Sequence, residues 1–285
     1  MPQPKMADKV TSQSSVKERL PNLLLGNNRT KRNALHPINF VGELKQWANF
    51  EQDVITEFQN HIWSSKRVLD YKPHGFLPLP SQRNEHVAVG DETGVQGRWQ
   101  EHVGQVMSSV FLDKGLDLTL GDFRASCSTY SKRPDVACIA HVQHVQSWHD
   151  NPPLPAQQVP HDLLFVGELK TPWITEHSLS QGIDNSKSFR HILGQIAQYM
   201  KDLNLKYGFM ATYNETVFLR QEKDGVTGKW ELQYSPVIMH STSGTSKTAS
   251  LRQCIWYMAR CAEAQRHVTN DTRRQLWVVR LRDEA

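Results

Sequence analysis

The chain has 285 residues and a formal net charge of +4, with 38% hydrophobic, 9% aromatic and 22% charged residues. This composition is typical of a globular protein and excludes a disordered or fibrous chain, and the slight basic excess is compatible with a nucleic-acid partner without being diagnostic. No window approaches the roughly 18 uninterrupted apolar residues of a membrane span, and the first residues lack the apolar core of a signal peptide. We therefore expect an intracellular protein, nuclear or cytoplasmic, with no membrane association.

The first 35 residues are polar with scattered lysine and arginine, which predicts a flexible basic arm with one short helix over 15–25. Residues 36–285 are expected to form one domain. Apolar periodicity and turn residues give its expected elements in chain order: a helix over 41–63, a loop over 72–90, a helix over 91–111, strands over 116–123 and 133–142, a proline-rich loop over 146–162, a strand over 163–170, a helix over 186–205, strands within 207–222 and 229–238, a helix over 251–268 and a strand over 274–282.

Cysteine and histidine patterns give weaker signals. The four cysteines, Cys127, Cys138, Cys254 and Cys261, contain no C-x-x-C pair, so they indicate reduced thiols, with an iron–sulfur site as a less favoured alternative. The proline-rich loop and the strand before it carry a cluster of histidines, which we interpret as solvated side chains rather than a second metal site.

Three charged residues stand at the ends of two predicted strands. Asp135 follows Pro134 at the start of one strand, and the next strand ends in Glu168-Leu169-Lys170. Because residues i and i+2 of a strand share a face, Glu168 and Lys170 are expected to project together from a strand otherwise built of apolar residues. Such charges fit either an ordinary turn cap and ion pair, or a site in which carboxylates hold a hard cation and a lysine stabilises a developing anion.

This pattern resembles the motif of the PD-(D/E)XK nuclease superfamily. The resemblance covers residues 90–220, where the expected order of helix, three strands, helix and strand is that of the superfamily core. Gln195 and Tyr199 match the Gln-x-x-x-Tyr element of RecB-type exonucleases, and the rhythm of GELKTPW is loosely similar to PD-(D/E)XK-like domains of fungal proteins. One departure is the separation of 33 positions between Asp135 and Glu168.

The resemblance implies an α/β fold with a restriction-endonuclease-like core, a mixed central sheet flanked by helices, and additional N- and C-terminal helices. It implies that Asp135, Glu168 and the Leu169 carbonyl hold Mg²⁺ or Mn²⁺, as hard cations prefer oxygen ligands. Lys170 would position the attacking water and stabilise the transition state, and Gln195 and Tyr199 would orient Lys170 or grip a nucleic-acid backbone.

Many members of the superfamily add a ligand from the first helix. At about 100° per residue, Glu92 and His102 fall on or beside the apolar stripe of the helix over 91–111, whereas Glu101 points away from it. We favour Glu92 as the additional metal ligand, with His102 as the alternative. Lys132, Arg133, Lys187 and Arg190 would form a phosphate-facing rim, although they also fit a solubilising surface.

The sequence therefore predicts a metal-dependent nuclease that hydrolyses phosphodiester bonds, with DNA favoured over RNA as the substrate. The alternative is a non-catalytic nucleic-acid-binding or toxin-like interaction module that keeps the fold. The sequence does not specify the oligomeric state, and a homodimer is compatible with it.

Overall fold

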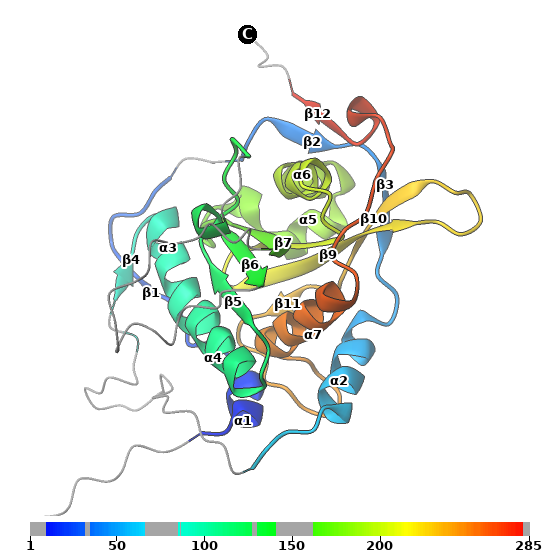
Figure 1. Ribbon diagram of the computed structural model, residues 1–285. Coiled ribbons are helices and arrows are strands. Elements are labelled where there is room, and N and C mark those ends of the chain that lie inside the picture. The colour runs from blue at the N-terminus through cyan, green and yellow to red at the C-terminus, as the bar shows by residue number, and fades with distance from the viewer. Residues whose placement is uncertain are drawn as a thin grey trace, which may run out of the picture.

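A mixed β-sheet forms the centre of the protein (Figure 1). The computed structural model describes residues 10–31, 35–65, 85, 87–126, 130–140 and 162–281. Among these, eight strands form the main sheet in the order β3-β10-β9-β8-β7-β6-β5, with β11 beside β9. Their bounds are β3 Glu43–Gln46, β5 Leu118–Gly121, β6 Val136–Ala140, β7 Asp162–Leu169, β8 Tyr207–Ala211, β9 Glu215–Lys223, β10 Trp230–Tyr234 and β11 Ile238–Met239. The prediction of an α/β fold with a mixed sheet and flanking helices is confirmed.

β7 has an antiparallel neighbour on one side and a parallel neighbour on the other. β6 pairs antiparallel with both β5 and β7, whereas β7 pairs in parallel with β8. A parallel connection requires a long crossover, and the chain makes it through α5 (Leu179–Asp184) and α6 (Ser186–Asp202). β8 is buried at every position, as expected for a strand covered on both faces.

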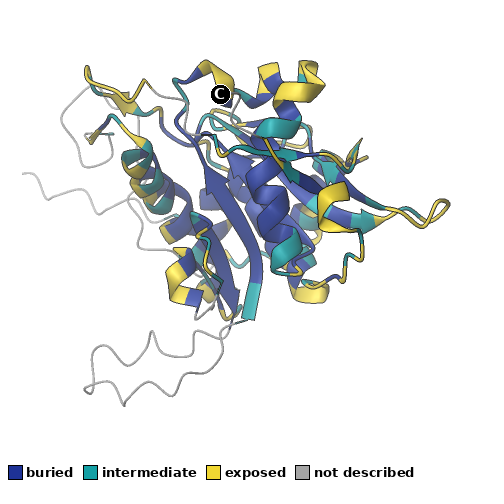
Figure 2. Ribbon diagram, turned by 90° about the horizontal axis from the view of Figure 1, so that it is seen from above, coloured by how far each residue is buried: buried dark blue, intermediate teal, exposed yellow. Residues whose placement is uncertain are grey.

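Helices cover both faces of the sheet and divide the core in two. Val136 and Cys138 of β6 pack into the cluster that includes α2 (Phe50–Asn60) and α7 (Leu251–Ala264). Ala137 and Ile139, which alternate with them, pack into the cluster that includes α6. Figure 2 shows the sheet and the inner helix faces buried, with exposed residues on the periphery.

The helix predicted over 91–111 is present but contains an irregular turn. It runs as α3 (Glu92–Trp99), a π-helical segment (Gln100–Gln105) and α4 (Val106–Asp113). The buried Arg252 guanidinium on α7 donates two hydrogen bonds to the His102 carbonyl within this segment, at 2.9 and 2.6 Å. The π turn is thus held by a side chain from a distant helix.

Two expectations about the N-terminal region differ from the structure. The single helix predicted over 41–63 is wrong for its first part, because β3 pairs with β10 there and α2 begins only at Phe50. A flexible arm was expected over residues 1–35, but the described residues of this region lie against the domain. They form α1 (Ser12–Lys17), which packs against α4 and α7, and β1 (Leu24–Leu25), which pairs with β4 (Ala88–Val89).

The remaining elements are short. β12 (Val278–Arg280) pairs antiparallel with β2 (Ile38–Phe40), and this two-stranded ribbon packs on α6. Short 3₁₀ helices span Phe123–Ser126, Thr175–His177 and Arg274–Leu276. In the described ranges, no helix has both the length and the apolar character needed to cross a bilayer. Cys127 and the histidine-rich loop, with His141, His144, His149 and His161, lie outside the described residues.

Candidate active site

The register of two neighbouring strands brings Asp135 and Glu168 together. Val136 of β6 pairs with Gly167 of β7, so the preceding Asp135 lies opposite the following Glu168. The Leu169 N–H donates to Asp135 Oδ2 at 2.8 Å, and the Gln96 amide of α3 donates to Asp135 Oδ1 at 2.7 Å. The long insertion between the two acidic residues therefore does not prevent the strand pairing that the motif requires.

Lys170 lies directly beside Glu168. Its Nζ is 2.7 Å from Glu168 Oε1, and both side chains are buried, with 2% of each residue exposed. The same Nζ lies 3.4 Å from both carboxylate oxygens of Glu92, which comes from the first turn of α3. The backbone of Lys170 is fixed because its N–H donates to the Ala211 carbonyl at 2.8 Å.

Burial raises the proton affinity of the two acidic groups. Loss of water around Asp135 raises its pKa to about 6, although the hydrogen bond from Leu169 opposes the change. Burial and the nearby Asp135 raise the pKa of Glu168 to about 8, with Lys170 opposing. For Lys170, burial alone would lower the pKa, but Glu168 and Glu92 outweigh burial and raise it. Because three carboxylates face one ammonium group, the site favours an added proton or cation.

The donor set at this point fits a hard divalent cation. Glu168 Oε2 is buried and has no hydrogen-bond partner among the described residues, which is costly for a carboxylate oxygen. Mg²⁺ is commonly held by one or two carboxylates together with water and substrate phosphate. Asp135, Glu168 and the Leu169 carbonyl are the residues that would hold it.

The structure does not add a third acidic ligand to this pair. Within the described part of the chain, no group of three or more His, Cys, Asp or Glu side chains is placed to hold a metal ion. Glu92 reaches the site, as expected, but its carboxylate contacts Lys170 instead of completing a three-residue ligand group. Among the described residues no further side chain is placed as a ligand, so water or substrate oxygens would complete the coordination.

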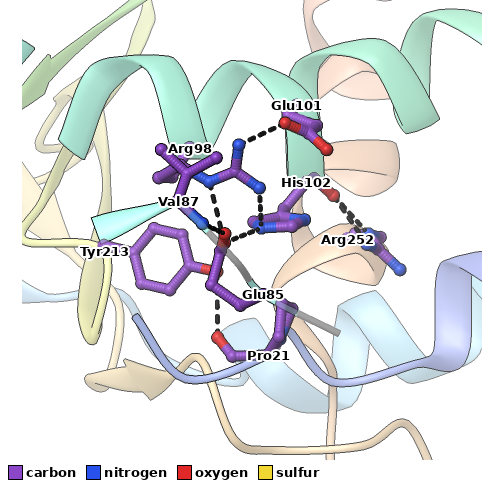
Figure 3. A network of polar contacts seen from close by, with 8 residues as sticks. All are labelled: Pro21, Glu85, Val87, Arg98, Glu101, His102, Tyr213 and Arg252. Carbon is purple, nitrogen blue, oxygen red and sulfur yellow. Dashed lines mark hydrogen bonds and ion pairs between the residues drawn. The ribbon is translucent and has the colours of Figure 1, made fainter. Parts of the chain in front are cut away.

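His102, the alternative ligand, belongs to a different network (Figure 3). It is fully buried, and its Nε2 lies 2.9 Å from Glu85 Oε2 and 3.1 Å from Arg98 Nη2. Arg98 also forms an ion pair with Glu101. None of these residues lines the cavity that contains Asp135 and Glu168, so the His102 alternative is not supported by the geometry.

Gln195 and Tyr199 lie in the same cavity as the acidic pair. Gln195 Nε2 donates to the Tyr199 hydroxyl at 2.6 Å, one helical turn along α6. Burial raises the pKa of Tyr199 to about 12, so its hydroxyl keeps its proton at neutral pH and can donate. The predicted five residues of the motif, Asp135, Glu168, Lys170, Gln195 and Tyr199, therefore line one cavity of about 720 Å³.

Basic residues from two distant parts of the chain line this cavity. Lys132 and Arg133 do so as predicted, and Arg274 and Arg280 join them from the C-terminal region. Lys187 and Arg190, the other two residues of the predicted phosphate-facing rim, do not line the cavity. Lys187 is exposed near the start of α6, whereas Tyr199 is near its end, and Arg190 Nη1 donates to the Gly42 carbonyl at 2.7 Å.

Asp202 connects two of these cations. Its Oδ2 accepts from Lys132 Nζ at 3.1 Å, from the Tyr130 hydroxyl at 2.8 Å and from Arg274 Nη2 at 3.5 Å. A carboxylate near the C-terminus of a helix is disfavoured by the helix dipole, and the cations compensate for this. We refer to Lys132 and Arg274 as the rim pair.

Several of these residues were missed by sequence reasoning. Gln96 could have been found, because it lies four residues after Glu92 and therefore on the same face of α3. Asp202, Arg274 and Arg280 carry no local signal, since only the packing of the C-terminal ribbon on α6 brings Arg274 and Arg280 to the cavity.

Comparisons with protein-family models, with curated proteins and with solved structures find no match in any of the three searches. The functional conclusion therefore rests on the contacts, burial and charges described above.

Proposed function

We propose that this chain is a Mg²⁺- or Mn²⁺-dependent nuclease that hydrolyses phosphodiester bonds, with DNA favoured over RNA. The observation that carries the proposal is the juxtaposition of Asp135 and Glu168 on paired strands, with Lys170 Nζ 2.7 Å from Glu168. The partnerless Glu168 oxygen and the cationic rim of the same cavity support it, because a nuclease must hold a cation and a polyanion side by side.

The order of elements around the site also supports the proposal. The chain passes from the helix that begins at Glu92 through β5, β6 and β7, then through α6 to β8. This is the order of helix, three strands, helix and strand that the resemblance to PD-(D/E)XK nucleases implies. We therefore include a restriction-endonuclease-like core in the proposal.

Each residue has a role that follows from its contacts. When bound, the cation would reduce the negative charge of the phosphate and promote ionisation of a water molecule. Glu168 holds the Lys170 ammonium in place, and Lys170 stabilises negative charge that develops on the phosphate. Gln96 and the Leu169 N–H orient the Asp135 carboxylate. The rim pair attracts flanking phosphates.

A cleavage assay tests the proposal. The purified full chain is incubated with single- and double-stranded DNA and RNA in Mg²⁺, Mn²⁺ or EDTA. We expect cutting only with the cation, and a loss of at least about 100-fold in Asp135→Asn and in Lys170→Met, the size typical of removing one electrostatic contact to the transition state. Arg260→Ala is the control, because Arg260 is on the outer side of α7 and pairs with Glu263. Equal cutting by all four proteins would refute the assignment of the site.

One observation favours the alternative, a nucleic-acid-binding module without turnover. Lys170 already occupies the Glu92 and Glu168 carboxylates, and no three-residue acidic group is present in the described ranges. This alternative predicts binding of nucleic acid through the rim cations but no cutting with Mg²⁺ or Mn²⁺ in any substrate.

A further inference from the structure

Two glutamine side chains on α6 present buried oxygen atoms without partners. Gln195 Oε1 and Gln198 Oε1 accept no hydrogen bond from any described residue, and the two residues are only 6% and 5% exposed. Both line the cavity that contains Asp135 and Glu168. They are three positions apart, so they lie on neighbouring positions of one helix face. Gln198 is not part of the Gln-x-x-x-Tyr pattern of Gln195 and Tyr199.

An unfilled buried acceptor needs a partner. Leaving such a group unpaired costs about 1–3 kcal/mol, and native proteins contain few of them. The amide nitrogen of Gln195 is engaged by the Tyr199 hydroxyl, and this contact leaves the carboxamide oxygen as the free end of the side chain. Both glutamines line the cavity, so a ligand bound there could supply the donors that the two oxygens lack.

The chemistry of these acceptors excludes phosphate as their partner. A carboxamide oxygen accepts hydrogen bonds, and a phosphodiester has only acceptor oxygens. The basic residues of the rim suit phosphate, whereas the two glutamine oxygens require an N–H or O–H group. A nucleotide offers such donors on the edge of its base and, in RNA, on the 2′-hydroxyl.

We infer that Gln198, together with Gln195, forms a nucleoside subsite that accepts hydrogen bonds from an unpaired nucleotide whose phosphates lie at the cationic rim. The inference rests on the proposed function, and it specifies the substrate as single-stranded at this position. In a duplex the Watson–Crick donors of a base are already used, and its remaining donors face the grooves, so a stacked and paired base does not reach acceptors buried on the wall of a cavity as an unpaired base can. Gln198 is thus a specificity-determining residue.

Binding measurements without cleavage test this subsite. Fluorescence anisotropy in EDTA compares labelled single strands of oligo(dA), oligo(dC) and oligo(dT), their RNA equivalents, a blunt duplex and an abasic deoxyribose-phosphate strand. The abasic strand keeps the phosphates but lacks the bases. For the wild type we expect at least one base-bearing or ribose-bearing single strand to bind about tenfold more tightly than the abasic strand and the duplex, which equals about 1.4 kcal/mol.

Two variants of Gln198 identify the residue responsible. Gln198→Met keeps the shape and removes the acceptor, so the tenfold preference should fall to about twofold or less. Gln198→Glu keeps the acceptor, so the preference should persist while affinity for every strand decreases through charge repulsion. Gln105→Met, at an exposed glutamine that does not line the cavity, should change nothing. If Gln198→Met does not fold, as judged by circular dichroism, Gln198→Glu tests the subsite in its place. Loss of the preference in Gln198→Glu would then overturn the subsite.

The outcomes separate the subsite from the proposed function. A preference that depends on base identity would assign the donor to the base, and one shared by all RNA strands would assign it to the 2′-hydroxyl. An unchanged preference in Gln198→Met, its loss in Gln198→Glu or its absence in the wild type would overturn the subsite. Absence of cutting in the assay above, with the preference intact, would overturn only the nuclease.

Discussion

Replacement of Glu168 by glutamine is expected to stabilise the protein at alkaline pH while it removes activity. Glutamine has nearly the same shape, and its oxygen can still accept a hydrogen bond from Lys170 Nζ. Lys170 Nζ also retains its ion pair with the Glu92 carboxylate, at 3.4 Å. The substitution therefore removes the buried negative charge and little else. We predict a gain in the free energy of unfolding that grows with pH, measured in the absence of divalent cations.

The size of the gain follows from the pKa of Glu168. In the folded protein this pKa is raised from 4.5 to about 8, mainly by burial. The unfolded chain releases the proton first, so the wild type loses stability as the pH rises from about 4.5 to about 8. A difference of 3.5 (8 − 4.5), at about 1.4 kcal/mol per pKa unit, sets an upper limit of about 5 kcal/mol. Because the pKa of about 8 already includes the opposing attraction to Lys170, we expect a gain of up to about 5 kcal/mol above pH 8 and about zero near pH 4.5.

Urea unfolding of both proteins in EDTA at several pH values between 5 and 9 measures this difference. Addition of Mg²⁺ should raise the midpoint of the wild type at pH 8 and leave that of Glu168→Gln unchanged, because only the wild type offers both carboxylates. A difference in stability that does not vary with pH, or a wild type that is more stable than the variant at pH 9, would refute the reasoning.

Three further substitutions probe the surroundings of the site. Asp202→Asn should release the rim pair and raise KM for nucleic acid a fewfold with little change in kcat, as measured by steady-state cleavage; a selective fall in kcat would contradict a positioning role. Arg252→Met should cost about 3 kcal/mol in thermal unfolding, because it removes two buried hydrogen bonds to the His102 carbonyl and one to the Ser15 carbonyl, whereas the exposed Arg260→Ala should cost less than about 0.5 kcal/mol. Gly194→Ala places a Cβ 2.0 Å from the Ile38 carbonyl oxygen, so it should push the β2–β12 ribbon away from α6 and lower the melting temperature by several degrees; an unchanged melting temperature would show that the ribbon does not pack there.

The additional metal ligand expected from the first helix shows what a projection of residues onto a helix face leaves out. An angle of about 100° per residue places both Glu92 and His102 on or beside the apolar stripe, and the helix enters a π-helical turn at Gln100, between them. His102 is buried, as its place on the stripe indicates, but a rise of about 1.5 Å per residue puts it about 15 Å along the helix from Glu92, where it contacts Glu85 and Arg98 instead. The turn is held by Arg252, which lies 150 residues further along the chain, and nothing local announces it.

The sequence by itself determined the local parts of the candidate site. A strand repeats every two residues and a helix every 3.6, so Glu168 with Lys170, and Gln195 with Tyr199, are placed on shared faces before any tertiary contact is known. Tertiary structure decided which distant residues join them. The β6–β7 register set Asp135 against Glu168, and the packing of the C-terminal ribbon brought Arg274 to the cavity, because such contacts depend on topology and on no local pattern.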